Sequence, residues 1–352
     1  MFETFGFEEL TAPQAAVFFA LAIGLAFGVL AQITRFCFRR AIVRTDRKQA
    51  AGIWLTALAV AVLGTQGAVA AQLISFAEHR FMAADLPVLA IITGGLLFGI
   101  GMVLTRGCVS RLSVLTGSGN LRAALVLVVF AVVAHATMKG ALAPIRTSLS
   151  EITVPVGAAL PGDALVWAGL IAALALLFAL RSGNRLGPLV GAAAIGALVP
   201  LAWVGTGFIL YDDFDPIAME ALSFTAPAAD TLFWSIASTS ISANFGVGLF
   251  AGVIAGALIA SVLRGQFQWQ SFESPRQTGR YMAGAALMGV GGVLAGGCTV
   301  GAGLSGVPTL SVAAILTLAS IAAGGWLAGR ALSASSSGSG AASTTPPLQP
   351  AE

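Results

Sequence analysis

The feature that most limits the fold of this chain is a series of apolar stretches, each about the length of a helix that crosses a bilayer. Within lipid, every backbone N–H and C=O must be satisfied inside the protein, so only helices and closed barrels span a membrane. The sequence therefore predicts an all-α polytopic membrane protein with about nine transmembrane helices. The nine stretches are approximately 13–34, 51–74, 87–105, 121–143, 161–181, 187–210, 244–263, 280–296 and 309–331.

Composition excludes several classes of protein. Of the 352 residues, 57% are hydrophobic and 9% are charged, whereas about 25% are charged in a typical soluble domain. A soluble enzyme, a disordered chain and a nucleic-acid reader are therefore excluded, and the bilayer is the expected surrounding. The first stretch follows acidic rather than basic residues and is too long for a cleaved signal. We expect one transport domain over residues 1–332 and, because residues 333–352 are rich in Ser, Gly and Pro, a disordered cytoplasmic tail.

The Lys and Arg residues indicate the orientation. With the N-terminus outside, 15 of the 18 fall on the cytoplasmic side, and only Arg80, Lys139 and Arg146 fall outside. Of the 15 acidic residues, 12 fall outside under the same topology. By the positive-inside rule, the sequence predicts a multi-pass protein of the bacterial inner membrane with a periplasmic N-terminus and a cytoplasmic C-terminus.

Two spans contain a repeated motif. GGLLFGIGMVLTRGC (Gly94–Cys108) matches GAALMGVGGVLAGGC (Gly284–Cys298) at eight of 15 positions, including a Gly-Cys pair in a chain with three cysteines. The predicted topology runs these spans in opposite directions, which is typical of transporters with inverted repeats. We expect a first repeat at about 13–143 and a second at about 230–331. A weaker match pairs 24–31 with 248–255, whose spans are predicted to be parallel; it is either chance or a sign that 230–242 is re-entrant.

The segments after Cys108 and Cys298 are too rich in Gly, Ser and Thr for a comfortable helix and too apolar for a solvated loop. Non-helical backbone at membrane depth occurs where it lines a cavity, and N–H groups that begin a half-helix attract anions. The sequence therefore predicts short re-entrant helices with Gly-Cys loops around an anionic solute. Alternatively, the glycines serve helix packing, the cysteines are buried apolar residues and the arginines extend to the cytoplasmic surface. The candidate pathway residues are Cys37, Cys108, Cys298, Arg106, Arg111, Gly107, Gly297, Thr299, Gly301, Gly303 and Ser305.

Three motifs resemble the YeeE/YedE family of bacterial sulfur-transport proteins, over about residues 20–330. They are RGCVSRLSVLTGSGNLRA (Arg106–Ala123), FGVGLFAGVIAG (Phe245–Gly256) and SFESPRQTGRYMAGAALMGVGGVLAGGCTVGAGLSG (Ser271–Gly306). The resemblance implies an hourglass-like helical bundle, thiosulfate uptake and a route lined by Cys37, Cys108 and Cys298, with Cys108 central. It also implies a possible partner, a small cytoplasmic sulfur-carrier protein. Ala302 departs from the family, because a polar residue such as Gln is expected there.

The resemblance implies uptake of thiosulfate, or a similar sulfur anion, and weak S–H hydrogen bonds would suit its passage along the cysteines. The alternative is a membrane sulfur carrier or sulfurtransferase that forms a cysteine persulfide, although neither histidine is near a cysteine motif. A soft-metal permease is disfavoured because Met and His form no cluster, and a purely structural subunit does not explain the repeated loops. We expect no enzyme activity, no metal site and no cofactor.

Overall fold

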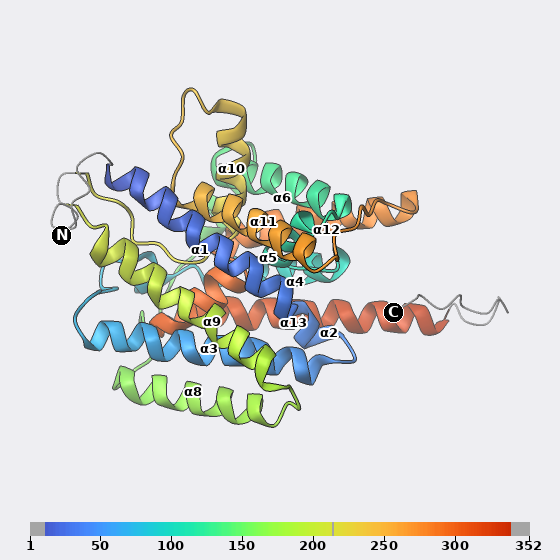
Figure 1. Cartoon of the computed structure of the whole chain (residues 1–352). Helices are drawn as coiled ribbons and strands as arrows, with labels where there is room; N and C mark the ends of the chain where they lie inside the picture. The colour runs from blue at the N-terminus through green and yellow to red at the C-terminus, as the bar shows by residue number, and fades with distance from the viewer. Residues whose placement is uncertain (1–10, 213–214, 339–352) are drawn as a thin grey trace.

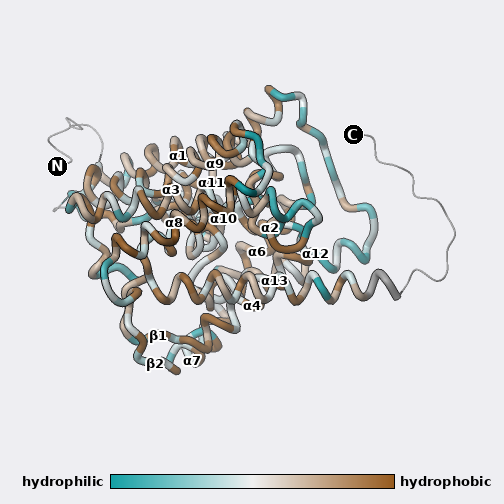
Figure 2. The backbone as a smooth tube through the Cα atoms, turned by 90° about the horizontal axis from the view of Figure 1, so that it is seen from below, coloured by the Kyte–Doolittle hydropathy of each residue, from teal (hydrophilic) through white to brown (hydrophobic). Residues whose placement is uncertain are grey.

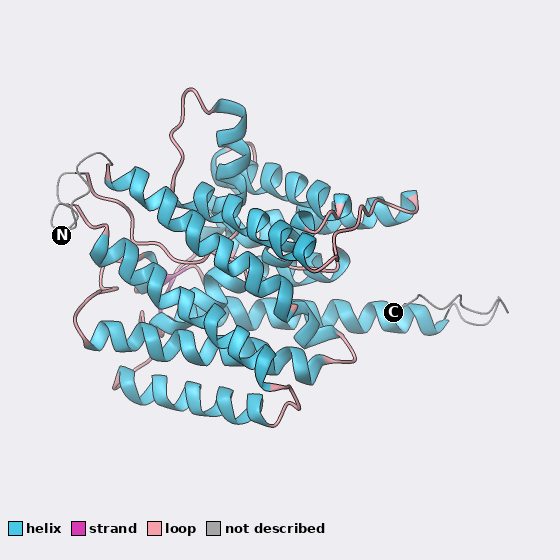
Figure 3. Cartoon of the chain, in the orientation of Figure 1, coloured by secondary structure: helices cyan, strands magenta, loops and turns pink. Residues whose placement is uncertain are grey.

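The chain folds into a bundle of α-helices joined mainly by short loops (Figure 1 and Figure 3). The structure, a computed structural model, describes residues 11–338 apart from 213–214, and it confirms the all-α polytopic fold class. The α-helices are α1 (Ala12–Thr34), α2 (Phe38–Val43), α3 (Arg47–Ala70), α4 (Val88–Leu104), α5 (Val109–Gly117), α6 (Leu121–Lys139), α7 (Ala143–Ser150), α8 (Ala164–Leu180), α9 (Leu186–Val204), α10 (Thr225–Ala237), α11 (Phe245–Leu263), α12 (Pro275–Leu294) and α13 (Val312–Gly338). The other elements are the 3₁₀-helices η2 (Arg80–Met82) and η5 (Val307–Thr309), the π-helices η3 (Gly205–Ile209) and η4 (Thr299–Gly306), and the antiparallel strands β1 (Asp85–Leu86) and β2 (Val154–Pro155).

Each of the nine predicted stretches coincides with a helix. Eight segments of the described chain are long and apolar enough to cross a membrane, and the stretch 161–181 forms the shorter helix α8, which has 17 residues. At about 1.5 Å per residue, α8 is about 25 Å long, near the lower limit for a span. The three cysteines lie in three segments that combine a long helix with the short helices after it. These segments are Ala12–Val43, Val88–Gly117 and Pro275–Thr309.

Helix α8 illustrates packing at the lipid boundary. Its buried residues are alanines on one face, of which Ala172 and Ala175 pack against Ala59 of α3. Its other face exposes Leu174 and Leu180. Hydrophilic residues gather in the loops at the helix ends, whereas the helices are largely hydrophobic (Figure 2). Such an apolar exterior suits lipid as the surrounding solvent.

The two copies of the strong repeat, α4 and α12, pack closely against each other. A Cβ atom added at Gly101 would lie 2.5 Å from the carbonyl oxygen of Gly284, and one added at Gly94 would lie 2.5 Å from the backbone nitrogen of Ala295. Residue numbers thus rise along α4 as they fall along α12, so the two helices are antiparallel, as in an inverted pair. Glycine permits this close backbone contact. The limits of the two repeats stay a prediction.

Helices α1 and α11, which carry the weaker match, are parallel. A Cβ atom added at Gly248 would meet the carbonyl group of Val17, and one added at Gly256 would meet that of Leu25. Residue numbers therefore rise together along the two helices. The match relates two neighbouring parallel helices, as the predicted topology required.

The chain dips into the bundle at residues 221–225, immediately before α10. Phe224 is fully buried, and its ring centroid lies 5.4 Å from that of Phe27 in α1. A Cβ atom added at Gly292 of α12 would lie 3.2 Å from the Thr225 methyl group. Helix α10 begins at this buried point, so the segment that enters the bundle is 221–225.

The stretch 230–242, which the sequence left open, contains most of α10 and part of the loop to α11. Asn244, the N-cap residue of α11, has its Nδ2 3.4 Å from Asp230 Oδ2. This side-chain contact closes the loop at the start of α11, and most of the residues from 234 to 244 are exposed. The part of the chain that enters the bundle therefore precedes this stretch.

Helix α13 extends further than the sequence suggested. It continues to Gly338, so residues 333–338 of the predicted tail are helical. Alanine and serine do not break a helix, and Gly338, its last residue, is the first glycine of the tail. The rest of the predicted disordered tail, 339–352, lies outside the described residues.

The close contact of α4 with α12 makes Gly101 sensitive to a single methyl group. We expect Gly101→Ala to lower stability by about 1–3 kcal/mol, because backbone atoms must move to accept the Cβ atom. The control is Gly169→Ala in α8, where an added Cβ atom has no neighbour within 4 Å. Thermal unfolding midpoints of the purified protein in detergent measure both changes. Equal midpoints for the two variants would contradict the packing described here.

Candidate functional site

The three cysteines occupy the same position in three similar turns. In each turn a long helix is followed by a residue with left-handed backbone geometry, one further residue follows, and the cysteine precedes the next short helix. A left-handed residue is a common helix terminator, so each long helix stops and a new one starts within a few residues. The left-handed residues are Arg35 (φ 54°), Arg106 (φ 62°) and Gly296 (φ 72°), and the cysteines are Cys37, Cys108 and Cys298.

The three turns bring the cysteines together inside the bundle. The thiols of Cys37 and Cys108 lie close enough to interact electrostatically, and Thr299 lies close to Cys108. The Cys108 Sγ also lies 3.3 Å from Ser110 Oγ. The exposed fractions of Cys37, Cys108 and Cys298 are 9%, 2% and 1%. The structure therefore places all three predicted cysteines in one buried region, which we call the thiol cluster.

A fully buried π-helix, η4, follows Cys298. The Gly301 backbone N–H donates to Cys298 Sγ at 3.3 Å, and Ser305 Oγ donates to the Leu222 carbonyl oxygen at 2.7 Å. Ser305 thus ties η4 to the buried segment before α10. A π-helix is rare and often marks a functional site. The other predicted residues of this loop, Thr299 and Gly303, are buried as well.

The predicted glycines of the loops differ in their steric requirement. A Cβ atom at Gly297 would lie 3.0 Å from the Ala302 backbone nitrogen, and one at Gly301 would lie 2.9 Å from Ser223 Oγ. At Gly107 the nearest atoms would be 3.4 Å away, which is ordinary contact. Close packing therefore explains Gly297 and Gly301 but not Gly107.

The two predicted arginines lie differently with respect to the thiol cluster. The Arg111 guanidinium lies within electrostatic range of Cys37 and Cys108, and its Nη1 is buried without a hydrogen-bond partner among the described residues. Arg106 is exposed and lines a cavity beyond the cluster. An anion at the thiols would therefore meet the charge of Arg111 first.

Two adjoining cavities approach η4 from the end of the bundle where α11 begins. The first, of about 320 Å³, contacts Gly301 and Ser305 of η4, and the second, of about 260 Å³, contacts Gly297. We call them the outer cavities. The first is also lined by Glu78, His79, Arg80, Trp203, Glu220 and Phe245, and the second by Arg80, Lys139, Arg146, Thr225 and Gly296.

The three cationic residues that the predicted topology places outside all line the second outer cavity. These residues, Arg80, Lys139 and Arg146, come from three separate parts of the chain. Thr225 is 6% exposed, and its Oγ1 and the Nε of Arg146 have no hydrogen-bond partner in the described structure. Sequence reasoning used the three cations only to count charges. Lys and Arg are rare on the outer side of a membrane protein, so the presence of these three residues there could have identified them as candidate functional residues.

His79 adds no charge to the outer cavities at neutral pH. Burial lowers its pKa to about 4, and the nearby Arg80 charge acts in the same direction. Its ring lies among those of Phe76, Phe81 and Trp203, and its Nδ1 accepts the Phe81 backbone N–H at 3.3 Å. The positive charge beside η4 therefore comes from Arg80, Lys139 and Arg146.

Another cavity, of about 630 Å³, lies beyond the Cys108 turn, near the loop that follows α11. We call it the inner arginine cavity. Thr105 and Leu112, on either side of the turn, form part of its wall. Its four cationic residues are Arg39, Arg44, Arg106 and Arg122.

The charges of this arrangement suit an anionic ligand. No group of three or more His, Cys, Asp or Glu residues that could hold a metal ion occurs in residues 11–338 as described. Thiols and hydroxyls occupy the buried centre, and a cationic cavity lies on each side of it, the second outer cavity and the inner arginine cavity. A thiol is a weak hydrogen-bond donor, so it can contact an anion without holding it strongly.

Comparison with known proteins gives consistent matches over most of the chain. The profile of a family described as sulphur transport matches residues 33–327, which include all three cysteine turns. The chain is 26% identical over 331 residues to a protein named thiosulfate transporter TsuA from Spirochaeta thermophila, covering 87% of this chain and 96% of that protein. It is also 26% identical over 318 residues to a thiosulfate transporter TsuA from Escherichia coli K12, covering 81% of this chain and 85% of that protein.

The lowered pKa of His79 predicts a pH-dependent stability. The unfolded chain takes up a proton near pH 6.5, whereas the folded chain does so only near pH 4. Stability is therefore full above about pH 6.5 and falls as the pH drops from about 6.5 toward 4. We expect the thermal midpoint of His79→Gln to depend less on pH than that of the wild type over this range. Equal slopes would show that His79 is not the responsible group.

Proposed function

This chain belongs to the sulphur transport family, and on that premise we propose that it carries thiosulfate, or a closely related inorganic sulfur anion, into the cell. The observation that carries the proposal is the position of the buried thiol cluster between the outer cavities and the inner arginine cavity. Cations at a cavity mouth raise the local concentration of an anionic substrate. The names of the two TsuA relatives support thiosulfate as the substrate.

In the proposed mechanism, weak donors pass the anion from one cavity to the other. Thiosulfate is a dianion, and a fixed cationic clamp at the centre would hold it too strongly for conduction, which needs several modest sites. The anion moves from Thr225 and Arg80 to Cys298 and Thr299. It then moves to Cys108 and Cys37, close to the charge of Arg111.

The proposal includes the bacterial inner membrane, with a periplasmic N-terminus and a cytoplasmic C-terminus. The 15-to-3 distribution of Lys and Arg supports this orientation. The arrangement of the cavities agrees with it, since four of the cytoplasmic arginines share one cavity and the three outer cations share another. A C-terminal reporter that is active only in the cytoplasm tests the orientation.

The adjacency of Cys37 and Cys108 favours a second candidate, a sulfur carrier. A Cys108 thiolate would attack the outer sulfur of thiosulfate, the S–S bond would break, and sulfite would leave with the electron pair. The resulting persulfide could pass its sulfur to Cys37 or to a small cytoplasmic sulfur-carrier protein. That protein is also the partner that we propose for the transporter.

Uptake of doubly labelled thiosulfate into proteoliposomes separates the two candidates. We expect both sulfur atoms to enter the vesicle together. We also expect Cys108→Ala to reduce the uptake rate at least about tenfold, because losing about 1.4 kcal/mol of stabilisation in the rate-limiting step slows it by that factor. The control is Thr116→Val in the same helix α5, whose hydroxyl bonds only to the Leu112 carbonyl oxygen in the described structure. Release of labelled sulfite outside would support the sulfur carrier, and full uptake by Cys108→Ser would contradict an essential thiol.

The outer cations should govern capture of the anion rather than its passage. We expect the double variant Lys139→Gln/Arg146→Gln to raise the KM for uptake roughly tenfold and to weaken its dependence on salt, because electrostatic attraction is screened by ions. The maximal rate should change little. The control is Arg185→Gln, an exposed arginine that lines none of the cavities described here. An unchanged KM, or a loss confined to the maximal rate, would contradict this role.

A further inference from the structure

The inner arginine cavity is lined by four arginines and, among the described residues, by no carboxylate. Arg44 and Arg106 both lie within electrostatic range of Arg39. In the described part of the chain, none of these three arginines forms an ion pair, whereas the neighbouring Arg40 is bound to Asp46 at 2.6 Å. Like charges that face one cavity repel each other, and an anion between them relieves that repulsion. The positive-inside rule explains the sign of these charges but not their convergence on one cavity.

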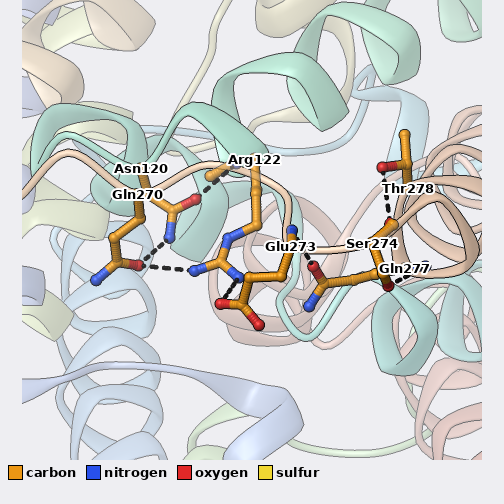
Figure 4. Close-up of polar contacts among 8 residues, drawn as sticks. Asn120, Arg122, Gln270, Glu273, Ser274, Gln277 and Thr278 are labelled. Atoms are coloured by element: carbon orange, nitrogen blue, oxygen red, sulfur yellow. Dashed lines mark hydrogen bonds and ion pairs between the residues drawn. The ribbon is translucent and has the colours of Figure 1, made fainter.

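The fourth arginine is fixed by the loop between α11 and α12 (Figure 4). Arg122 Nη1 donates to Glu273 Oε1 at 3.2 Å, and its Nη2 donates to Gln270 Oε1 at 3.3 Å. Asn120 Nδ2 donates to the same Gln270 oxygen at 2.7 Å, and the Leu121 backbone N–H donates to the Gln270 carbonyl at 2.9 Å. The loop is therefore held firmly at the rim of the cavity, with the Arg122 guanidinium oriented by two acceptors.

Glu273 forms an ion pair with Arg122, and Glu273 is the more exposed partner. Its side chain is 76% exposed, whereas that of Arg122 is 16% exposed. An exposed carboxylate gains little from such a pair, because water and salt screen it. A doubly charged anion inside the cavity can therefore compete with Glu273 for the guanidinium.

The cavity adjoins the thiol cluster. Thr105, in its wall, donates through Oγ1 to the Gly101 carbonyl at 2.9 Å and lies 3.0 Å from the Gly107 carbonyl. Gly107 directly precedes Cys108, so only this one turn separates the cavity from the cysteine. An anion held in the cavity thus sits where an anion leaving Cys108 would have to pass.

We propose that the inner arginine cavity is a binding site for a tetrahedral inorganic dianion, and that a dianion bound there from the cytoplasmic side slows further uptake. Arg39, Arg44 and Arg106 supply the charge, and Arg122 supplies a fourth guanidinium when it leaves Glu273. Guanidinium groups suit this ligand because they donate to oxyanions in pairs. The site itself rests on the geometry described above, whereas the slowing of uptake rests on the proposed transport function.

Equilibrium binding of labelled sulfate to the full-length protein in detergent tests the site. Lys139→Gln/Arg146→Gln serves as the background, so that the outer cavities contribute little. We expect Arg39→Gln and Arg106→Asn each to weaken binding on the order of tenfold. Asn is chosen at position 106 because it tolerates left-handed geometry.

The matched control is Arg35→Asn. Arg35 has the same left-handed backbone, the same charge and the same exposed position after its helix, but it does not line the cavity. Its variant should bind sulfate like the background protein. Glu273→Gln should bind several-fold more tightly because Arg122 becomes free, and a gain of binding does not arise from misfolding. Equal affinities for Arg35→Asn and Arg106→Asn, no gain in Glu273→Gln, or no sulfate binding at all would overturn the proposal.

Uptake into proteoliposomes with anions sealed inside tests the effect on transport. Internal sulfate should slow thiosulfate uptake by the wild type and by Arg35→Asn, and it should slow uptake by Arg39→Gln/Arg106→Asn less. If only internal thiosulfate slows uptake, the transported anion itself is the ligand of the cavity. If internal sulfate slows uptake equally, the cavity binds cytoplasmic oxyanions in general. Inhibition that is the same in all three proteins would overturn the regulatory part. Sulfate binding is measured without transport, so the binding result can be interpreted even if the protein does not transport thiosulfate.

Discussion

A backbone N–H or C=O group left unpaired in lipid costs several kcal/mol, and this constraint shapes the whole bundle. The three cysteine turns interrupt helices at depth, so their backbone groups need partners within the protein. The Phe36 N–H donates to the Ala31 carbonyl at 3.2 Å, and the Gly107 N–H donates to the Met102 carbonyl at 3.1 Å. The turns themselves are enclosed, since the three cysteines are buried. Close helix packing through glycine, as between α4 and α12, keeps lipid away from them.

Enclosure by protein also explains the chemistry of the centre. A group of fixed charges in such a place would be costly and would bind an anion tightly. In the proposed mechanism, protonated thiols and the Thr299 hydroxyl avoid both problems, because they need little solvation and donate weakly. The charges lie instead in the cavities on each side, where water screens them. Arg111 is the exception, because its guanidinium lies within electrostatic range of the thiols and its Nη1 has no hydrogen-bond partner among the described residues.

Hydrophobic pattern predicted most of the fold, because a span needs only a run of apolar residues and the nine runs are well separated. The predicted topology also ran α4 and α12 in opposite directions, but it did not predict that the two helices pack against each other. The segment 221–225 escaped because it enters the bundle without a long apolar run. The convergence of Arg80, Lys139 and Arg146 escaped for another reason: they are far apart in sequence, and only tertiary structure joins them. The sequence did not show that the three cysteine turns share one backbone geometry. Glycine is the usual residue at a left-handed position, and only Gly296 is a glycine among the three.

The three cysteine turns differ in the residue at their left-handed position, which is arginine in two of them and glycine in the third. Glycine is the least strained residue at positive φ, and a side chain there costs roughly 1 kcal/mol. Glycine occupies this position, Gly296, in the turn beside the outer cavities, whereas Arg35 and Arg106 occupy it in the other two turns. The same backbone geometry thus carries a charged side chain in two of the turns and none in the third. In the proposed mechanism, an anion that leaves Cys108 for the inner arginine cavity would therefore meet the guanidinium of Arg106, which lines that cavity, directly after the turn.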